Sequence, residues 1–200
     1  LAALRERFGA DWKKEDETKP AELNEVIIAR MKGAALEFGA TLWVGLPAIE
    51  SLRPAPGGQA VAFAMNVELS PHPDASYCVL VAPADASAPA VMVATQSATN
   101  PDWTRDGRSL VYFKGSGGAG VNDDLRLGAL VQREVIDATG RISLAKNSTD
   151  LAGLIFHQQS RVRCLRDGRI LFNAPPFHLP TTGANDNDRA QLFALDRTKE

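Results

Sequence analysis

Apolar residues alternate with small or polar ones through most of this chain after residue 47, in short runs that are separated by turns. Alternation at every second position is typical of a β-strand, because successive side chains point to opposite faces of a sheet. Gly, Pro and Asp bound the runs and favour turns there. The pattern therefore predicts a mainly β chain. The strand-like runs lie at 60–65, 77–81, 90–94, 109–113, 125–135, 151–157, 161–164, 170–172 and 191–196.

Residues 1–45 have a different pattern. Apolar residues recur there at spacings of three and four, at Leu23, Val26, Ile27, Met31 and Ala34. This spacing predicts an amphipathic helix, with Pro20 in its first turn and Gly39 at its end. We therefore expect a helical N-terminal extension over residues 1–45, which packs on its own domain, for example as a cap on an exposed sheet edge. The alternatives are that it docks on a partner or belongs to a preceding domain.

One turn-flanked segment recurs along the chain. Residues 101–112 read Pro-Asp-Trp-Thr-Arg-Asp-Gly-Arg-Ser-Leu-Val-Tyr, and residues 163–172 read Arg-Cys-Leu-Arg-Asp-Gly-Arg-Ile-Leu-Phe. A weaker copy at 53–63 has Pro-Gly-Gly at its turn. Asp and Gly accept the positive φ of a tight turn, so each copy predicts a hairpin followed by a strand. Self-similarity of this kind is typical of repeat architectures.

The turn glycines set the size of the repeat. Gly58, Gly107 and Gly168 are separated by 49 and 61 residues, and a propeller blade of four antiparallel strands takes about 40–50 residues. The spacing predicts blades at about 46–97, 98–158 and 159–200. The fold class that we expect is thus a partial β-propeller of four-stranded antiparallel blades behind a helical extension.

The run 101–108 resembles the β-propeller repeat of TolB and its relatives. That repeat reads roughly Pro-x-Trp-Ser-Pro-Asp-Gly-Lys/Arg, and 191–196 is similar to its later strand, Leu-Tyr-Val-x-Asp. The resemblance covers about residues 48–200, although Arg105 and Arg166 stand where the usual repeat has Pro. It implies a bacterial protein in the periplasm or another extracytoplasmic setting. We assign turn and blade-packing roles to Gly58, Trp103, Asp106, Gly107, Asp167 and Gly168.

Three repeats are few for a closed ring, since propellers usually carry four to eight blades. We expect the chain to be a fragment with further blades beyond Glu200. Closure by the helical start, or by another chain, is the alternative. The chain starts at Leu1 without an initiator Met or a signal-peptide pattern, which indicates a removed leader or a start inside a longer protein.

Composition and charge exclude several classes of protein. The formal net charge is −2 and no basic run carries interleaved aromatic residues, so nucleic-acid binding is not indicated. No apolar stretch approaches the ~20 residues of a membrane span. Cys78 and Cys164 form no Cys-x-x-Cys pair. We expect two buried, unpaired thiols, with a disulfide as the alternative.

No catalytic constellation is visible in the sequence. A serine hydrolase would show Gly-x-Ser-x-Gly, and the Gly-Ser-Gly-Gly run at 115–118 lacks that spacing. His72, His157 and His178 fall in separate repeats and form no local metal-binding pair. A metal site would require these histidines to converge from different blades. We assign no catalytic residue and no cofactor.

Three loops are the candidate binding segments, at 69–76, 114–124 and 175–189. The acidic residues in two of them offer hard oxygen ligands for Ca²⁺, although neither loop matches an EF-hand. Ordinary solvated turns are the alternative reading of these residues. The candidate binding residues are His72, Asn122, Asp123, Asp124, His178, Asn185, Asp186 and Asp188.

These features predict a non-catalytic binding or scaffold module that presents its rim loops to a protein or glycan partner. The alternative is the propeller part of a larger enzyme, such as a prolyl-oligopeptidase-type serine peptidase or a polysaccharide lyase, whose catalytic residues lie outside this chain. Fold analogy alone does not choose a ligand.

Overall fold

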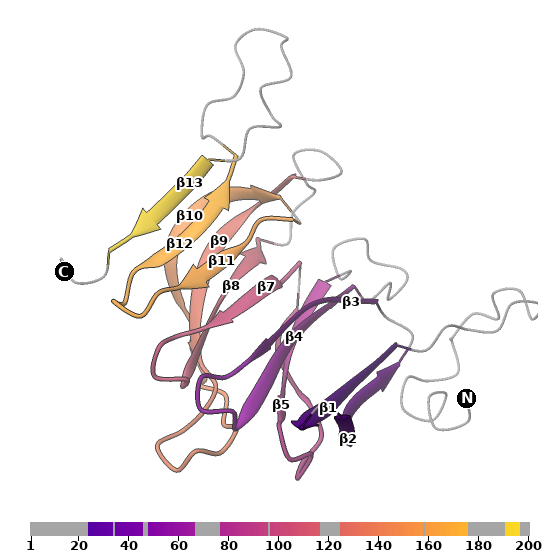
Figure 1. Ribbon diagram of the computed structural model, residues 1–200. Helices are drawn as coiled ribbons and strands as arrows, with labels where there is room; N and C mark the ends of the chain where they lie inside the picture. The colour runs from indigo at the N-terminus through magenta and orange to yellow at the C-terminus, as the bar shows by residue number, and fades with distance from the viewer. Residues whose placement is uncertain are drawn as a thin grey trace, which may run out of the picture.

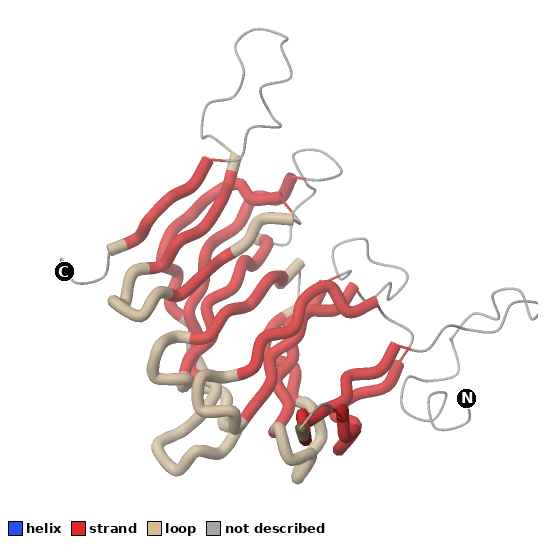
Figure 2. Tube along the Cα trace, in the orientation of Figure 1, coloured by secondary structure: helices blue, strands red, loops and turns tan. Residues whose placement is uncertain are grey.

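The computed structural model describes residues 24–33, 35–45, 48–66, 77–95, 97–116, 125–157, 159–175 and 191–196. Within these ranges the regular secondary structure consists of strands (Figure 2). No helix of the described part is long and apolar enough to cross a bilayer.

Most strands belong to three consecutive meanders, which we call blades. Within each blade, neighbours in sequence pair antiparallel. Blade 1 contains β3 (Ala48–Pro54), β4 (Ala60–Asn66), β5 (Tyr77–Pro83) and β6 (Val91–Ala94). Blade 2 contains β7 (Thr99–Trp103), β8 (Ser109–Gly115), β9 (Leu125–Glu134) and β10 (Thr149–His157). Blade 3 contains, among the described residues, β11 (Val162–Cys164), β12 (Ile170–Ala174) and β13 (Gln191–Leu195).

The blades stand side by side around their first strands. We call these first strands, β3, β7 and β11, the inner strands, and β7 lies between the other two (Figure 1). Four-stranded antiparallel sheets that stack through their faces, with the first strand of each toward a common side, are the architecture of a β-propeller. The predicted fold class, a mainly β chain that forms part of a propeller, is confirmed.

Strand β8 shows how one strand serves two interfaces. Leu110 and Tyr112 face blade 1, whereas Val111 and Phe113 face blade 3, and each is at most 1% exposed. Alternate side chains of a strand point to opposite faces, so the part of β8 that is covered on both sides, residues 110–113, is apolar at every position.

Different side chains fill the two interfaces. Between blades 1 and 2, the alanines of β4 leave room for large rings from blade 2. Between blades 2 and 3, Phe113 stacks on Phe156 at 5.2 Å between ring centroids, and Phe172 meets Phe113 edge-on at 6.4 Å. The interface of blades 1 and 2 includes Ala60, Ala62, Ala64, Val79, Val81, Trp103, Leu110 and Tyr112.

The predicted helix over residues 24–38 is wrong, because this segment forms two strands. β1 (Asn24–Lys32) pairs antiparallel with β2 (Ala35–Gly45). Val26 is 3% exposed, Ile27 is 37% exposed and Ile28 is partly buried, which is a period of two. A run of three β-branched residues favours a strand, since each loses side-chain freedom in a helix. The first 23 residues of the predicted extension lie outside the described part.

The β1–β2 hairpin covers the face of blade 1 that points away from blade 2. Val26 and Leu42 join Phe63 and its neighbours in one buried cluster, and the ring of Trp43 lies 6.3 Å from that of Phe63. Gly39 lies inside β2 instead of ending a helix, and a Cβ there would stand 3.1 Å from the carbonyl oxygen of Ile28. The hairpin therefore caps the exposed face of the sheet.

Candidate functional site

The turns between the first and second strands of the three blades share one geometry. Gly58, Gly107 and Gly168 have φ values of 70°, 67° and 89°. Each donates its backbone N–H to the carbonyl three residues earlier, at 2.8, 2.9 and 3.1 Å. A turn that ends in a left-handed residue favours glycine, since other residues meet steric cost there. The predicted turn glycines thus occupy equivalent corners, at the end of the blades that we call the turn rim.

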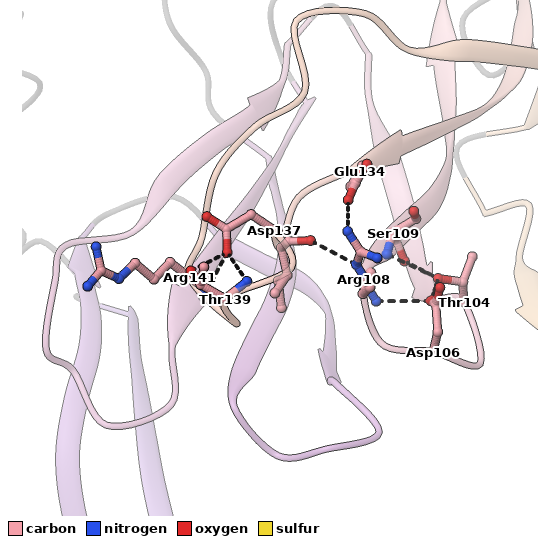
Figure 3. Close-up of polar contacts among 9 residues, drawn as sticks. Thr104, Asp106, Arg108, Ser109, Glu134, Asp137, Thr139 and Arg141 are labelled. Atoms are coloured by element: carbon pink, nitrogen blue, oxygen red, sulfur yellow. Dashed lines mark hydrogen bonds and ion pairs between the residues drawn. The ribbon is translucent and has the colours of Figure 1, made fainter.

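The Thr104–Ser109 turn of blade 2 is held by side-chain hydrogen bonds (Figure 3). Asp106 Oδ1 accepts from the Thr104 hydroxyl at 2.7 Å and from the Arg108 backbone N–H at 3.0 Å. Thr104 Oγ1 in turn accepts from the Ser109 N–H at 3.0 Å. The Thr104 hydrogen bond, more than the Arg108 contacts, holds the pKa of Asp106 below its usual value.

In the turn of blade 3, Asp167 takes the same position. Its carboxylate accepts from the Arg169 backbone N–H at 3.0 Å and from Arg169 Nε at 2.8 Å. The side-chain hydrogen bond from Arg169 is the main reason that the pKa of Asp167 is lowered. The Asp137 turn of blade 2 lies on the same rim, and there Thr139 plays the corresponding part (Figure 3).

The corner turns also contact one another from blade to blade. Gln59 Nε2 donates to the carbonyl of Gly107 at 3.4 Å, and Arg105 Nη1 donates to the carbonyl of Arg166 at 2.8 Å. A side chain of the first turn therefore binds the backbone of the second, and a side chain of the second binds the backbone of the third. Arg105 stands where the usual repeat has proline, and its side chain makes this contact, so its departure from the motif has a structural role.

Trp103 joins the inner strands of blades 1 and 2. Its ring is 4% exposed, and its Nε1 donates to the carbonyl of Arg53 at 2.9 Å. A buried indole usually finds such an acceptor. The side chain lies in the buried cluster between the two blades.

The opposite ends of the blades form the loop rim. Strands β4, β8 and β12 each start at the turn rim, so their last residues, and the first residues of β5, β9 and β13, lie at the other end (Figure 1). The three candidate binding loops connect these strand ends. The candidate residues His72, Asn122, Asp123, Asp124, His178, Asn185, Asp186 and Asp188 lie outside the described residues.

The remaining candidate groups lie apart from one another. His157 ends β10, where its Nδ1 accepts from the Gln159 N–H at 3.5 Å. Cys78 is buried between blade 1 and the hairpin, and burial raises the pKa of its thiol to about 11. Cys164 is half-buried on β11. Within the described ranges, no three His, Cys, Asp or Glu side chains cluster as metal ligands would.

The inner strands bring together charged residues that the sequence reasoning missed. Arg53, Asp102 and Arg163 each stand five residues before a turn glycine. Asp102 Oδ1 lies 3.9 Å from Arg53 Nε and 3.9 Å from Arg163 Nη1, and its Oδ2 accepts from the Cys164 N–H at 2.8 Å. Equivalent positions of neighbouring repeats meet where the inner strands lie side by side. Aligning the three repeats on their turn glycines would therefore have predicted this cluster.

Asn100 extends the polar contact between blades 2 and 3. It is 3% exposed and has a φ of 50°, at an irregularity in the pairing of β7 with β8. Its Nδ2 donates to the carbonyl of Ser160 at 2.7 Å, and its Oδ1 accepts from Arg161 Nη1. A residue other than glycine rarely adopts a left-handed backbone, and these two hydrogen bonds hold Asn100 in that conformation.

Comparisons with known proteins yield a structural likeness. No protein-family model matches the sequence, and no curated protein matches it. Among solved structures, the β-propeller domain of the Trilobed protease from Pyrococcus furiosus, which has an open velcro topology, is similar. The match covers 80% of this chain and 43% of that chain, at 15% identity and a TM-score of 0.46. The chain thus spans less than half the length of that structure.

Proposed function

We propose that this chain is a non-catalytic binding module, a TolB-like propeller segment that presents the loops of its loop rim to a protein or glycan partner outside the cytoplasm. One observation supports this function above all. The connections at 69–76, 114–124 and 175–189 join second to third strands in all three blades, so their anchoring strand ends share one rim.

The two rims differ in a way that suits a structural role for the turn rim and a binding role for the loop rim. On the turn rim, short corners bind one another through Gln59 and Arg105, which fixes the spacing of the blades. On the loop rim, the connecting segments carry the polar residues Asp123, Asp124, Asp186 and Asp188. A rigid scaffold with binding residues on its loops is a common design for recognition.

The test compares the two rims directly. Purified protein is applied to a glycan array and to bacterial periplasmic extract, and each captured molecule is then titrated as a pure component. We expect Asp123→Ala/Asp124→Ala and Asp186→Ala/Asp188→Ala to weaken binding at least about tenfold, the usual effect of removing central polar contacts. Arg141→Gln, on the turn rim, is the matched control and should bind as the wild type.

Two results would overturn the proposal. One is the absence of any partner that binds the pure protein. The other is a partner whose affinity is unchanged by all loop-rim substitutions. Repeating the titration with EDTA tests whether Ca²⁺ takes part at residues 122–124 or 185–188, since a hard cation held by carboxylates is removed by the chelator.

A further inference from the structure

The inner strands carry more positive than negative charge where they meet. Arg53 on β3 and Arg163 on β11 flank Asp102 on β7, and Arg161, just before β11, lies close enough to Arg53 to repel it. These four side chains carry a net charge of about +2, because arginine stays protonated in proteins. The excess occurs in a chain whose formal net charge is −2.

Asp102 does not satisfy the guanidinium groups beside it. Both of its distances to arginine nitrogens are 3.9 Å, which is longer than a hydrogen bond. Its shorter contact, at 2.8 Å, goes to the backbone N–H of Cys164 instead. The carboxylate is 13% exposed, and its hydrogen bond with Cys164 holds β11 against β7.

Arg53 has an unused buried donor. Its Nη1 donates to the neighbouring carbonyl of Leu52 at 3.0 Å, but its Nε, which is buried, has no acceptor among the described residues. Burial foremost, and then repulsion from Arg163 and Arg161, lowers the pKa of this side chain. A buried donor without an acceptor is costly, the more so when it is charged.

We propose that Arg53 and Arg163 together bind an oxyanion, the carboxylate or phosphate group of a ligand, beside Asp102 at the inner strands. The planar fork of a guanidinium matches both groups and binds them through two parallel hydrogen bonds. Arg163 is 58% exposed and gives the ligand access, while Arg53, at 26% exposed, supplies the less hydrated donor. The site lies toward the turn rim, and it does not depend on the function proposed for the loop rim.

Isothermal titration of the 200-residue chain tests this site. The probes are inorganic phosphate and glutarate, added at constant ionic strength against sodium chloride, since salt screens non-specific attraction. We expect a Kd of about 1 mM or tighter for at least one of them, within reach of a few charge-assisted hydrogen bonds. Stronger binding of phosphate indicates a phosphate-bearing ligand, and stronger binding of glutarate a carboxylate-bearing one.

Substitutions distinguish a binding site from a structural ion pair. Arg163→Gln should weaken the bound probe about tenfold, and Arg53→Lys, which keeps the charge but not the fork, should weaken it less. Asp102→Asn keeps an oxygen for the Cys164 N–H and removes the competing charge. It should therefore tighten binding about fivefold. Arg141→Gln, an arginine that extends away from its turn (Figure 3), should leave it unchanged.

Three outcomes contradict the proposal. The first is that neither probe binds the wild type. The second is that Arg141→Gln weakens binding as much as Arg163→Gln, because the attraction would then be general. The third is that Asp102→Asn, in folded protein, fails to tighten binding. Circular dichroism of each variant shows that it is folded, and the exposed Arg163 gives a variant that does not disturb the interior.

Discussion

At the scale of single residues, Gly107 and Gly168 distinguish two reasons for glycine in a turn: a left-handed backbone, and lack of space for a Cβ. Both have a left-handed backbone, but a Cβ on Gly107 would stand 3.3 Å from Gln59 Nε2 and 3.4 Å from the Pro56 ring, whereas one on Gly168 meets nothing within 4 Å. We expect Gly168→Ala to cost about 1 kcal/mol, the price of the backbone conformation, and Gly107→Ala about 1 kcal/mol more.

Urea unfolding of both variants measures this difference. The added loss at Gly107 should come from displaced contacts between the first two corner turns, so Gln59→Ala, which removes the nearer of the two neighbours, should reduce it. Equal losses of unfolding free energy for the two glycine variants would mean that the contact between the first two turns does not contribute to stability.

Asp106 makes the stability of its turn depend on pH. Its folded-state pKa lies below the ordinary value of 3.8, chiefly because the Thr104 hydroxyl donates to the carboxylate. A lowered folded-state pKa stabilises the protein above pH 3.8, and this contribution is lost as the pH falls through the folded-state value. The carboxylate is largely exposed, so solvent screening reduces the effect to about 0.5 kcal/mol.

The measurement compares Asp106→Ala with the wild type between pH 7 and pH 2.5. We expect the variant to be less stable at pH 7, and the difference in unfolding free energy to shrink below pH 3.8 as the wild-type carboxylate takes up a proton. A difference that stays constant over the whole range would assign the role of Asp106 to its uncharged hydrogen bonds.

At the scale of elements, a β1 strand and a helix over the same residues predict different effects of substitutions at Val26 and Ile27. In a helix, Val26 and Ile27 would both lie on the apolar stripe, but in β1 they point to opposite faces. Val26→Ala should therefore cost about 1–2 kcal/mol, since it removes buried methyl groups beside Phe63. Ile27→Ala should change stability by less than about 0.5 kcal/mol. Comparable losses at both sites by urea unfolding would support the helix.

The same elements show what the sequence could predict and what it could not. The corner turns were predictable because the residues that form each turn, with glycine at the left-handed position, are consecutive in the sequence. The hairpin was not, because Val26, Ile27 and Ile28 fit a period of two as well as one of 3.6, and packing on Phe63 of another element decides between them. The meeting of Arg53 with Asp102 was also missed, since it depends on which inner strands become neighbours. The loop-rim residues remain predictions.

At the scale of the whole molecule, the blades form a row in which each contacts its neighbours. The buried residues fall into three clusters: one between the hairpin and blade 1, one between blades 1 and 2, and one between blades 2 and 3. Stability in such a row is approximately the sum of the units and their interfaces. Damage at one interface should then remain local, and blades 1 and 2, each covered on both faces, should be the most protected.

Two substitutions on the same strand test this arrangement. Leu110 faces blade 1 and Phe113 faces blade 3, and both are fully buried. Each alanine variant should lose about 3–4 kcal/mol. In hydrogen exchange, Phe113→Ala should expose the amides of β11 and β12 while those of β4 stay protected, and Leu110→Ala should do the reverse. If both variants raised exchange equally in blades 1 and 3, the three blades would unfold as one unit. The contacts between the inner strands would then couple the two interfaces, in addition to the side-chain packing within each.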